Sequence, residues 1–428
     1  MKHSANTDAI VQFNKALDAL KQLPESVLTV EYELAIQAAV GLAYMLCKGY
    51  AATEVEKAYA RAYSLCRTIG ETTSTFPILC GLWEYYVVRA EFPTAKELAG
   101  QLLSIANQTS DPIFTYEAKR AMGGTLFWLG QLENSHDYLK GGFETKSNGP
   151  VNRISTQTYS QDTEVANLSN FACVLWLQGF PDRALEKANQ AIQLADELSH
   201  PFSMAYANAF STFVHQLRGD DLSVKKQAEM MISISDKYEF YYWRTIGKML
   251  HSSALMNIHQ DSQYIIAYEE ALQDYKNTGS RLALSYFQAL LAQSYCYASR
   301  YSQARDIIES TLTDIDKNKE YFFKADLFRL KGEIILAAEQ NETTAEKYYQ
   351  ASLDIARQQK AYALELRAST SLGQLWQQQG NYHEALTLLD GAIDQINEGF
   401  SCTDWLRAIN LQKELKSQLI ADQQGKLA

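Results

Sequence analysis

The sequence predicts an all-α protein, a right-handed α-solenoid of about nine helical hairpins that follow one another about every 40 residues. Three observations predict it. Apolar residues keep helical spacing along the chain, with no convincing run of β-type alternation. Small residues recur at one offset in every repeat, and glycine-containing turns fall between the expected helices.

The clearest signal is the register of small residues, which is expected midway along the first helix of each hairpin. Random placement would put Gly, Ala, Ser or Thr at roughly a quarter to a third of these positions. The nine members are Gly41, Gly81, Gly123, Ala172, Thr212, Ser252, Ala292, Gly332 and Gly373. A bulky residue follows three positions later, on the same helical face, in most repeats: Tyr44, Leu126, Leu175, Leu255, Tyr295, Ile335 and Trp376.

A second small register is expected early in the second helix of each hairpin. Its members are Ala95, Ala184, Ala304, Ala345 and Ala385. Val224 and Tyr264 break the pattern in two repeats. Helices approach closely where side chains are small, so the two registers predict the contact between the paired helices. Gly130, Gly179 and Gly219 lie between the registers and supply the turn.

The repeats divide the chain into segments in a definite order. We expect an N-terminal helix or cap at 1–30, repeats one to three at 31–145, a loop insertion at 146–162, repeats four to nine at 163–400, and a C-terminal capping helix and tail at 401–428. The loop interrupts the helical pattern and contains Gly149-Pro150. A polar-faced helix over 403–420 is expected to cap the stack.

Composition narrows the classes of partner. A net charge of -11 and a pI near 5.3 disfavour a broad phosphate-binding surface, so no nucleic-acid partner is expected. No stretch approaches 18 apolar residues and the N-terminus lacks a secretion signal, so we expect no membrane partner and a cytoplasmic location. The six cysteines form no C-x-x-C pair and are expected to be reduced and mostly buried.

Catalytic motifs are not found. No two of the seven histidines have the i, i+4 spacing of a helical metal site. His215 lies three residues after Thr212, at the bulky position of its repeat, and is expected to be packed in the core. There is no G-x-S-x-G elbow, no Cys/His signature and no phosphate-binding G-x-x-x-x-G-K-[ST] loop. We therefore expect a protein that is not an enzyme and that has no cofactor and no metal site.

The period and the small–large register resemble the tetratricopeptide superfamily, whose usual repeat is 34 residues. Residues 325–336 (ADLFRLKGEIIL), 364–372 (LELRASTSL) and 398–400 (EGF) resemble more closely the C-terminal repeat region of bacterial signal-transduction ATPases and class III nucleotide cyclases. More distantly, the array is similar to the repeat domain of the maltose-regulon activator, which binds a small ligand. Residues 159–162 match a family Tyr-Gly-Gln-Asp, but Asn152 stands where the family has histidine.

Neighbouring first helices are expected to line the inner, concave wall of the superhelix. Their residues that should face this wall are candidates for binding a partner. They mix aromatic, amide and charged side chains, which suits peptide recognition, although an ordinary solvated face has the same composition. Asp326 and Arg367 share an offset on successive first helices and should form an inter-repeat ion pair or a polar ligand site. The candidates are Tyr206, Gln216, Tyr286, Gln293, Asp326, Arg329, Glu333, Arg367, Gln374 and Gln377.

These observations predict a non-catalytic protein-interaction and sensing scaffold that binds a partner polypeptide on its concave face. The alternative is a small-ligand sensor that regulates an associated ATPase or nucleotide cyclase domain, as the resemblance implies. Arg329 and Arg367 are expected to be exposed, so that changing both should abolish partner binding and leave the fold intact. The aromatic stretch at 238–243 is expected to be core between repeats.

Overall fold

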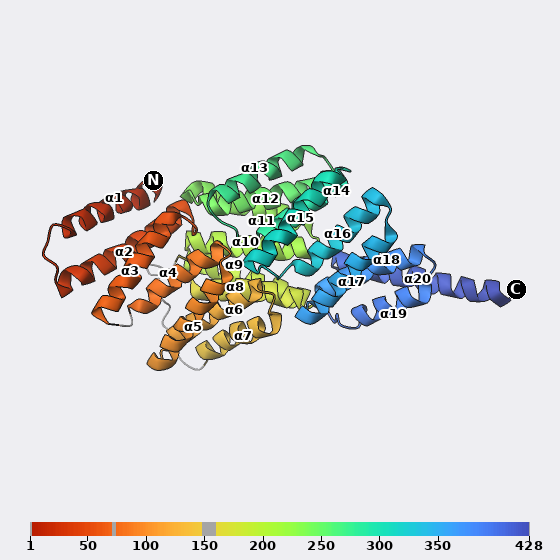
Figure 1. Cartoon of the computed structure of the whole chain (residues 1–428), viewed down its shortest axis with the longest axis horizontal. Coiled ribbons are helices and arrows are strands. Elements are labelled where there is room, and N and C mark those ends of the chain that lie inside the picture. Colours follow the sequence, from red (N-terminus) through yellow and green to blue (C-terminus); the bar gives the residue numbers. More distant parts are fainter. Residues whose placement is uncertain (1, 71–73, 148–159, 428) are drawn as a thin grey trace.

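The computed structural model describes residues 2–70, 74–147 and 160–427 (Figure 1). Within these residues the chain forms twenty helices and no strand, and 84% of the described residues are helical. Eighteen of the helices pair as nine successive hairpins, from α2/α3 to α18/α19. The helices α1 (Lys2–Leu20) and α20 (Thr403–Leu427) flank the array. The predicted fold class is confirmed.

The hairpins have a first helix that carries the small register and a second helix that packs on it. The first helices are α2 (Val27–Lys48), α4 (Thr75–Val88), α6 (Pro112–Trp128), α8 (Thr163–Leu177), α10 (Pro201–Arg218), α12 (Tyr241–His259), α14 (Leu284–Tyr297), α16 (Lys324–Glu339) and α18 (Tyr362–Gln378). The second helices are α3 (Thr53–Ile69), α5 (Phe92–Thr109), α7 (Leu132–Ser147), α9 (Pro181–Leu198), α11 (Asp221–Tyr238), α13 (Gln263–Asn277), α15 (Tyr301–Asn318), α17 (Glu342–Gln359) and α19 (Tyr382–Ile393).

The two small registers meet where the paired helices approach. A Cβ placed on Gly332 would lie 2.6 Å from the Tyr349 ring and 3.1 Å from the carbonyl oxygen of Ala345. In the third hairpin the corresponding glycine, Gly123, would meet the carbonyl oxygen of Ser135 at 3.2 Å, and the Ser135 hydroxyl donates to the Gly123 carbonyl at 2.7 Å. The small residues therefore let backbone approach backbone within each hairpin.

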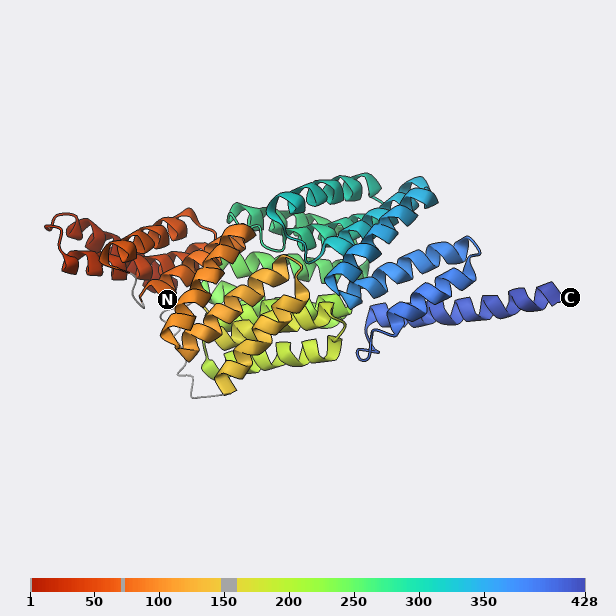
Figure 2. The ribbon, with the colours of Figure 1, turned by 60° about the horizontal axis from the view of Figure 1, so that its bottom comes forward.

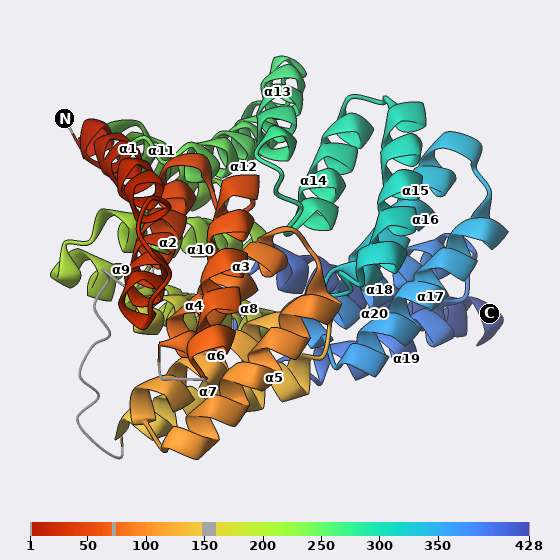
Figure 3. The same cartoon turned by 60° about the vertical axis from the view of Figure 1, so that its left-hand side comes forward.

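The hairpins wind into a superhelix whose successive turns contact each other (Figures 2 and 3). The backbone N–H of Arg281, between α13 and α14, donates to the carbonyl of Val88 at the end of α4, at 2.8 Å. The same contact recurs one hairpin later, where Tyr321 N–H donates to Trp128 O at 2.9 Å. Carbonyls at the C-terminal ends of first helices, which lack intrahelical partners, are thus satisfied by linkers four to five hairpins further along.

Further contacts between turns join the C-terminal part of the array to its middle. The Glu398 carboxylate accepts from the backbone N–H groups of Asp182 and Arg183 at 3.0 and 2.9 Å, at the start of α9. Lys360 reaches Glu133 on α7. Because the turns touch, the interior of the superhelix is largely filled with side chains, and its wall is less open than the sequence predicted.

Three further expectations from the sequence have mixed outcomes. Of the predicted loop at 146–162, residues 146 and 147 belong to α7, and 148–159 lie outside the described residues. The cysteines are free, four of them buried and Cys47 and Cys296 half-buried. Contrary to expectation, α2 has the length and hydropathy of a possible membrane span. Here it is the first helix of a hairpin, with Val40 and Met45 buried.

Candidate functional site

A polar cleft of about 560 Å³ opens inside the superhelix between the fifth hairpin and the C-terminal helices. Successive first helices α10, α12, α14, α16 and α18 contribute to its wall, together with the start of α20. Its volume falls within the roughly 300–1,000 Å³ of ligand clefts. The cleft brings together six of the predicted residues: Gln216, Gln293, Arg329, Glu333, Arg367 and Gln374.

Side-chain amides from separate helices line this cleft. Gln293 on α14 is half-buried and Gln374 on α18 is exposed, and neither side-chain amide hydrogen bonds to another described residue. Gln216 accepts from the Tyr286 hydroxyl at 2.5 Å, and Asn257 donates to Asp221 at 2.9 Å. Amides both donate and accept, so this wall can satisfy the N–H and C=O groups of an extended chain.

The arginines of the candidate set form the floor of the cleft rather than its exposed wall. Arg367 donates to Asp404 on α20 at 2.7 Å and lies 3.5 Å from Asp326, which confirms the predicted reach of that pair. Arg329 donates to Asp326 at 2.6 Å and also contacts Glu333. Only 8% of Arg329 and 1% of Asp326 are exposed. The expectation that both arginines are exposed is therefore wrong.

Burial changes what this network does. Burial alone would raise the pKa of the Asp326 carboxyl, but the guanidinium groups of Arg329 and Arg367 lower it below its usual value. Asp326 is thus held ionised beneath the cleft. By contrast, Arg407 on α20 lines the cleft, is exposed, and forms no ion pair with another described residue. Arg407 is the cation available to a ligand.

The other candidates lie outside the cleft wall. Tyr286 is fully buried and reaches the cleft only through its bond to Gln216. Gln377 donates to Glu414 and Gln418, both at 3.1 Å, and so fastens α18 to α20. Tyr206 lines a different cavity.

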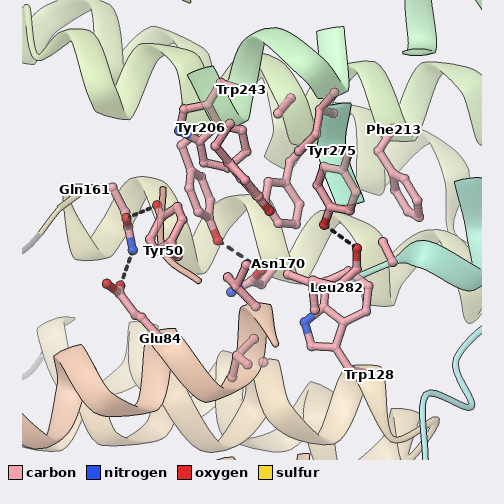
Figure 4. Close-up of a pocket in the computed structure, with 18 of the residues that line it drawn as sticks. Tyr50, Glu84, Trp128, Gln161, Asn170, Tyr206, Phe213, Trp243, Tyr275 and Leu282 are labelled. Atoms are coloured by element: carbon pink, nitrogen blue, oxygen red, sulfur yellow. Dashed lines mark hydrogen bonds between the residues drawn. The ribbon is translucent and has the colours of Figure 1, made fainter. Parts of the chain in front are cut away.

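This second cavity, of about 100 Å³, lies among the first helices from α4 to α14 and is walled mainly by aromatic rings (Figure 4). Tyr242 and Trp243 contribute to it, so the aromatic stretch expected to be core also lines a cavity. The Tyr206 hydroxyl is 3.4 Å from Asn170 Oδ1, and the Tyr50 hydroxyl donates to Gln161 at 2.8 Å. The cavity shares no lining residue with the cleft.

Buried charges lie at one side of this cavity. Glu84 accepts from Gln161 Nε2 at 2.6 Å and from the Ser160 hydroxyl at 3.1 Å. Arg120 lies 3.6 Å from Glu84 and is bonded more closely to Glu117. Burial raises the pKa of the Glu84 carboxyl to about 7, against the opposing attraction of Arg120.

The positions of Glu84 and Arg120 in their repeats indicate these buried charges, although neither residue was among the predicted candidates. Glu84 lies three residues after the small residue Gly81, at the seam position that is bulky in most repeats. Arg120 precedes Gly123 by the same three residues by which Arg329 precedes Gly332. A carboxylate three residues earlier completes both buried pairs, Glu117–Arg120 and Asp326–Arg329. A charged residue three positions from a small-register residue therefore indicates a buried charge.

Metal-ligating side chains do not cluster within the part of the chain that the structure describes: no group of three His, Cys, Asp or Glu lies together there. His215 is 8% exposed, and its Nδ1 lies 3.3 Å from Asp220. Burial lowers the pKa of His215. His215 therefore packs at its seam position, as predicted.

Comparison with known proteins supports the fold. No protein-family model matches the chain, and no curated protein matches it. A Rap protein complexed with the competence and sporulation factor has a TM-score of 0.53 at 12% identity, over 81% of this chain and 100% of that one. The Cut9–Hcn1 hetero-tetramer of APC/C gives 0.51 at 11%, over 89% and 62%. The chain is similar to these two proteins in fold, as an all-helical array of hairpins.

Proposed function

We propose that this protein is a non-catalytic binding scaffold that holds an extended segment of a partner polypeptide in the cleft between α10 and α20. The observation that carries this proposal is the cleft wall itself, where the side-chain amides of Gln293 and Gln374 lie on separate first helices and have no hydrogen-bond partner in the described part of the chain. An extended chain in a cleft must find partners for its backbone N–H and C=O groups. Amides spaced along the superhelix offer those hydrogen-bond partners. Because they would bind the backbone of the partner, they do not require one particular amino-acid sequence in it.

The charges of the cleft indicate how the partner would be oriented in it. Arg407 at the α20 end is exposed and unpaired among the described residues, so it would pair with a carboxylate of the partner. The network of Asp326, Arg329 and Arg367 is satisfied internally and holds the floor rigid. Rigid walls reduce the ordering cost of binding. In the Rap complex, a chain of similar fold likewise holds a bound factor.

A displayed library of random short peptides, selected on the purified protein, tests the proposal. Arg407→Glu and Gln374→Ala should each weaken the selected peptides at least tenfold, or about 1.4 kcal/mol, with unchanged melting temperature. Lys416→Glu is the matched control, because it reverses an exposed charge of the same helix away from the cleft. Failure to enrich any peptide, or binding that both cleft variants leave unchanged, would contradict the proposal.

A further inference from the structure

The aromatic cavity between α4 and α12 carries an inference that does not rest on the proposed peptide cleft. Its wall includes three tryptophans, Trp83, Trp128 and Trp243, and the tyrosines Tyr206 and Tyr242. The electron-rich faces of such rings attract cations within about 6 Å, with tryptophan the strongest. Arg120 already shows this attraction, since its guanidinium carbon lies 4.8 Å from the centre of the Trp83 ring.

The charges beside the cavity do not cancel. Glu84 and Glu117 supply two carboxyl groups, and Arg120 is the one basic side chain among the described residues that line the cavity. Arg120 is engaged chiefly by Glu117, through both Nε and Nη2. When Glu84 is ionised, one buried negative charge therefore remains that protein groups only partly offset. Such a charge is costly unless a cation is brought to it.

The size of the cavity limits the ligand. Its volume of about 100 Å³ is below the roughly 150 Å³ of an engineered protein cavity that accommodates benzene, so the enclosed part of a ligand is limited to about four heavy atoms, the size of a trimethylammonium head group. We propose that the cavity binds a small organic ammonium ion, whose nitrogen packs against the aromatic rings and pairs with Glu84. Gln161 and Ser160 hold the Glu84 carboxylate in place from the side of α8. A sugar or an anion does not match this lining.

Three probes of one shape but different charge test the proposal. Choline carries a permanent positive charge, 3,3-dimethyl-1-butanol is its uncharged isostere, and 3,3-dimethylbutanoate is an anion of similar size. Tryptophan fluorescence is the readout, since Trp83, Trp128 and Trp243 line the cavity. Choline should bind at least tenfold more tightly than the alcohol, and the anion should not bind. Equal binding of all three probes, or binding of none, would overturn the proposal.

Two variants separate the cavity from the rest of the surface. Gly124 lines the cavity, and a Cβ there would come no nearer than 3.4 Å to Asn170 and 3.8 Å to Trp83. Gly124→Leu should therefore fill the cavity without unfolding α6 and should abolish choline binding. Gly100→Leu is the matched control, because a Cβ at Gly100 on α5 meets nothing within 4 Å. Choline binding that survives Gly124→Leu would place the site elsewhere.

The pH dependence identifies the counter-ion. Because the pKa of Glu84 is about 7 in the free protein, choline must displace its proton below that pH, and affinity should rise about tenfold between pH 6 and 8. The groups that face Glu84 are Tyr50, Tyr59, Glu117, Arg120 and Tyr206. Burial raises the pKa values of the three tyrosines, and the neighbouring carboxylates raise that of Arg120, so these four side chains do not titrate in this window. Glu84→Gln should remove both the pH dependence and the preference for choline over the alcohol; retention of both would overturn the assignment.

Discussion

Arg367 contacts four other helices through its guanidinium group. It donates to Asp404 on α20 and to the carbonyl of Leu217 at the end of α10, and it lies 3.5 Å from Asp326 on α16. Its guanidinium carbon is also 4.9 Å from the Trp176 ring on α8. A side chain at an inner-wall offset has thus become a structural link between turns of the superhelix.

Removing this link should therefore cost stability. Arg367→Ala leaves the buried Asp326 with one cation fewer, and we expect a loss of about 3–5 kcal/mol in the free energy of unfolding at pH 7. Because the folded state lowers the pKa of Asp326, its contribution is present above the unfolded value near 3.9 and is lost as the pH falls through the folded value. Urea denaturation measures both effects. Arg407→Ala, at an exposed site, should change stability by less than about 0.5 kcal/mol, and equal losses in the two variants would contradict this role.

At the scale of elements, each hairpin depends on the approach of its two helices. The small registers set that approach, as Gly332 shows against Ala345 and Tyr349. Where the second register lacks alanine, another small residue can replace it, as Ser135 does in the third hairpin with a hydroxyl bond to Gly123. These positions therefore require a small side chain where the two helices cross, and alanine is one of several residues that meet this requirement.

Gly332→Leu tests this packing. A leucine there must displace the Tyr349 ring and the backbone of α17, so we expect overpacking to cost about 1–3 kcal/mol or more. Gly391→Leu on α19 is the control, since a Cβ at that helical glycine meets nothing within 4 Å. Thermal melts should separate the two variants. Coincident melts would show that the crossing lies elsewhere.

At the scale of the whole molecule, the contact between turns decides which surfaces are open. Gly399, after the last hairpin, packs against Pro181 at the start of α9, and its backbone φ is +75°. Together with Glu398 on the backbone of α9, this contact closes the superhelix in its C-terminal half. The polar cleft lies next to this contact, because Thr403 and Asp404, which follow Gly399 closely in the chain, line it.

Gly399→Leu should open the superhelix without unfolding its hairpins. A Cβ at this position would overlap the Pro181 ring, so we expect a larger radius of gyration by small-angle X-ray scattering and an unchanged helical signal by circular dichroism. Gly380→Leu has the same strained backbone, with φ +81°, but its Cβ meets nothing within 4 Å. Gly380→Leu should keep the parent's dimensions, and if Gly399→Leu does too, the turns are held by other contacts.

The helices, their pairing and their crossing points could be predicted from the sequence, because these depend on local propensity and on residues within one repeat. The small register from Gly41 to Gly373 is such a local signal, and all nine members lie in first helices. The register also predicts that Asp326 and Arg367 lie close together, because neighbouring hairpins have the same geometry, and the two side chains are 3.5 Å apart.

Which inner-wall residues are exposed could not be predicted from the sequence, because their exposure depends on how the turns of the superhelix pack. The pitch of the superhelix is the sum of small rotations over many hairpins, and no local pattern in the sequence records that sum. The pitch brings Val88 against Arg281 and Trp128 against Tyr321. It thereby buries Arg329 and Tyr286, leaves Gln374 and Arg407 in a cleft, and encloses Glu84 among aromatic rings. Equal offsets along the repeat therefore have unequal exposure, because each hairpin meets a different part of the next turn.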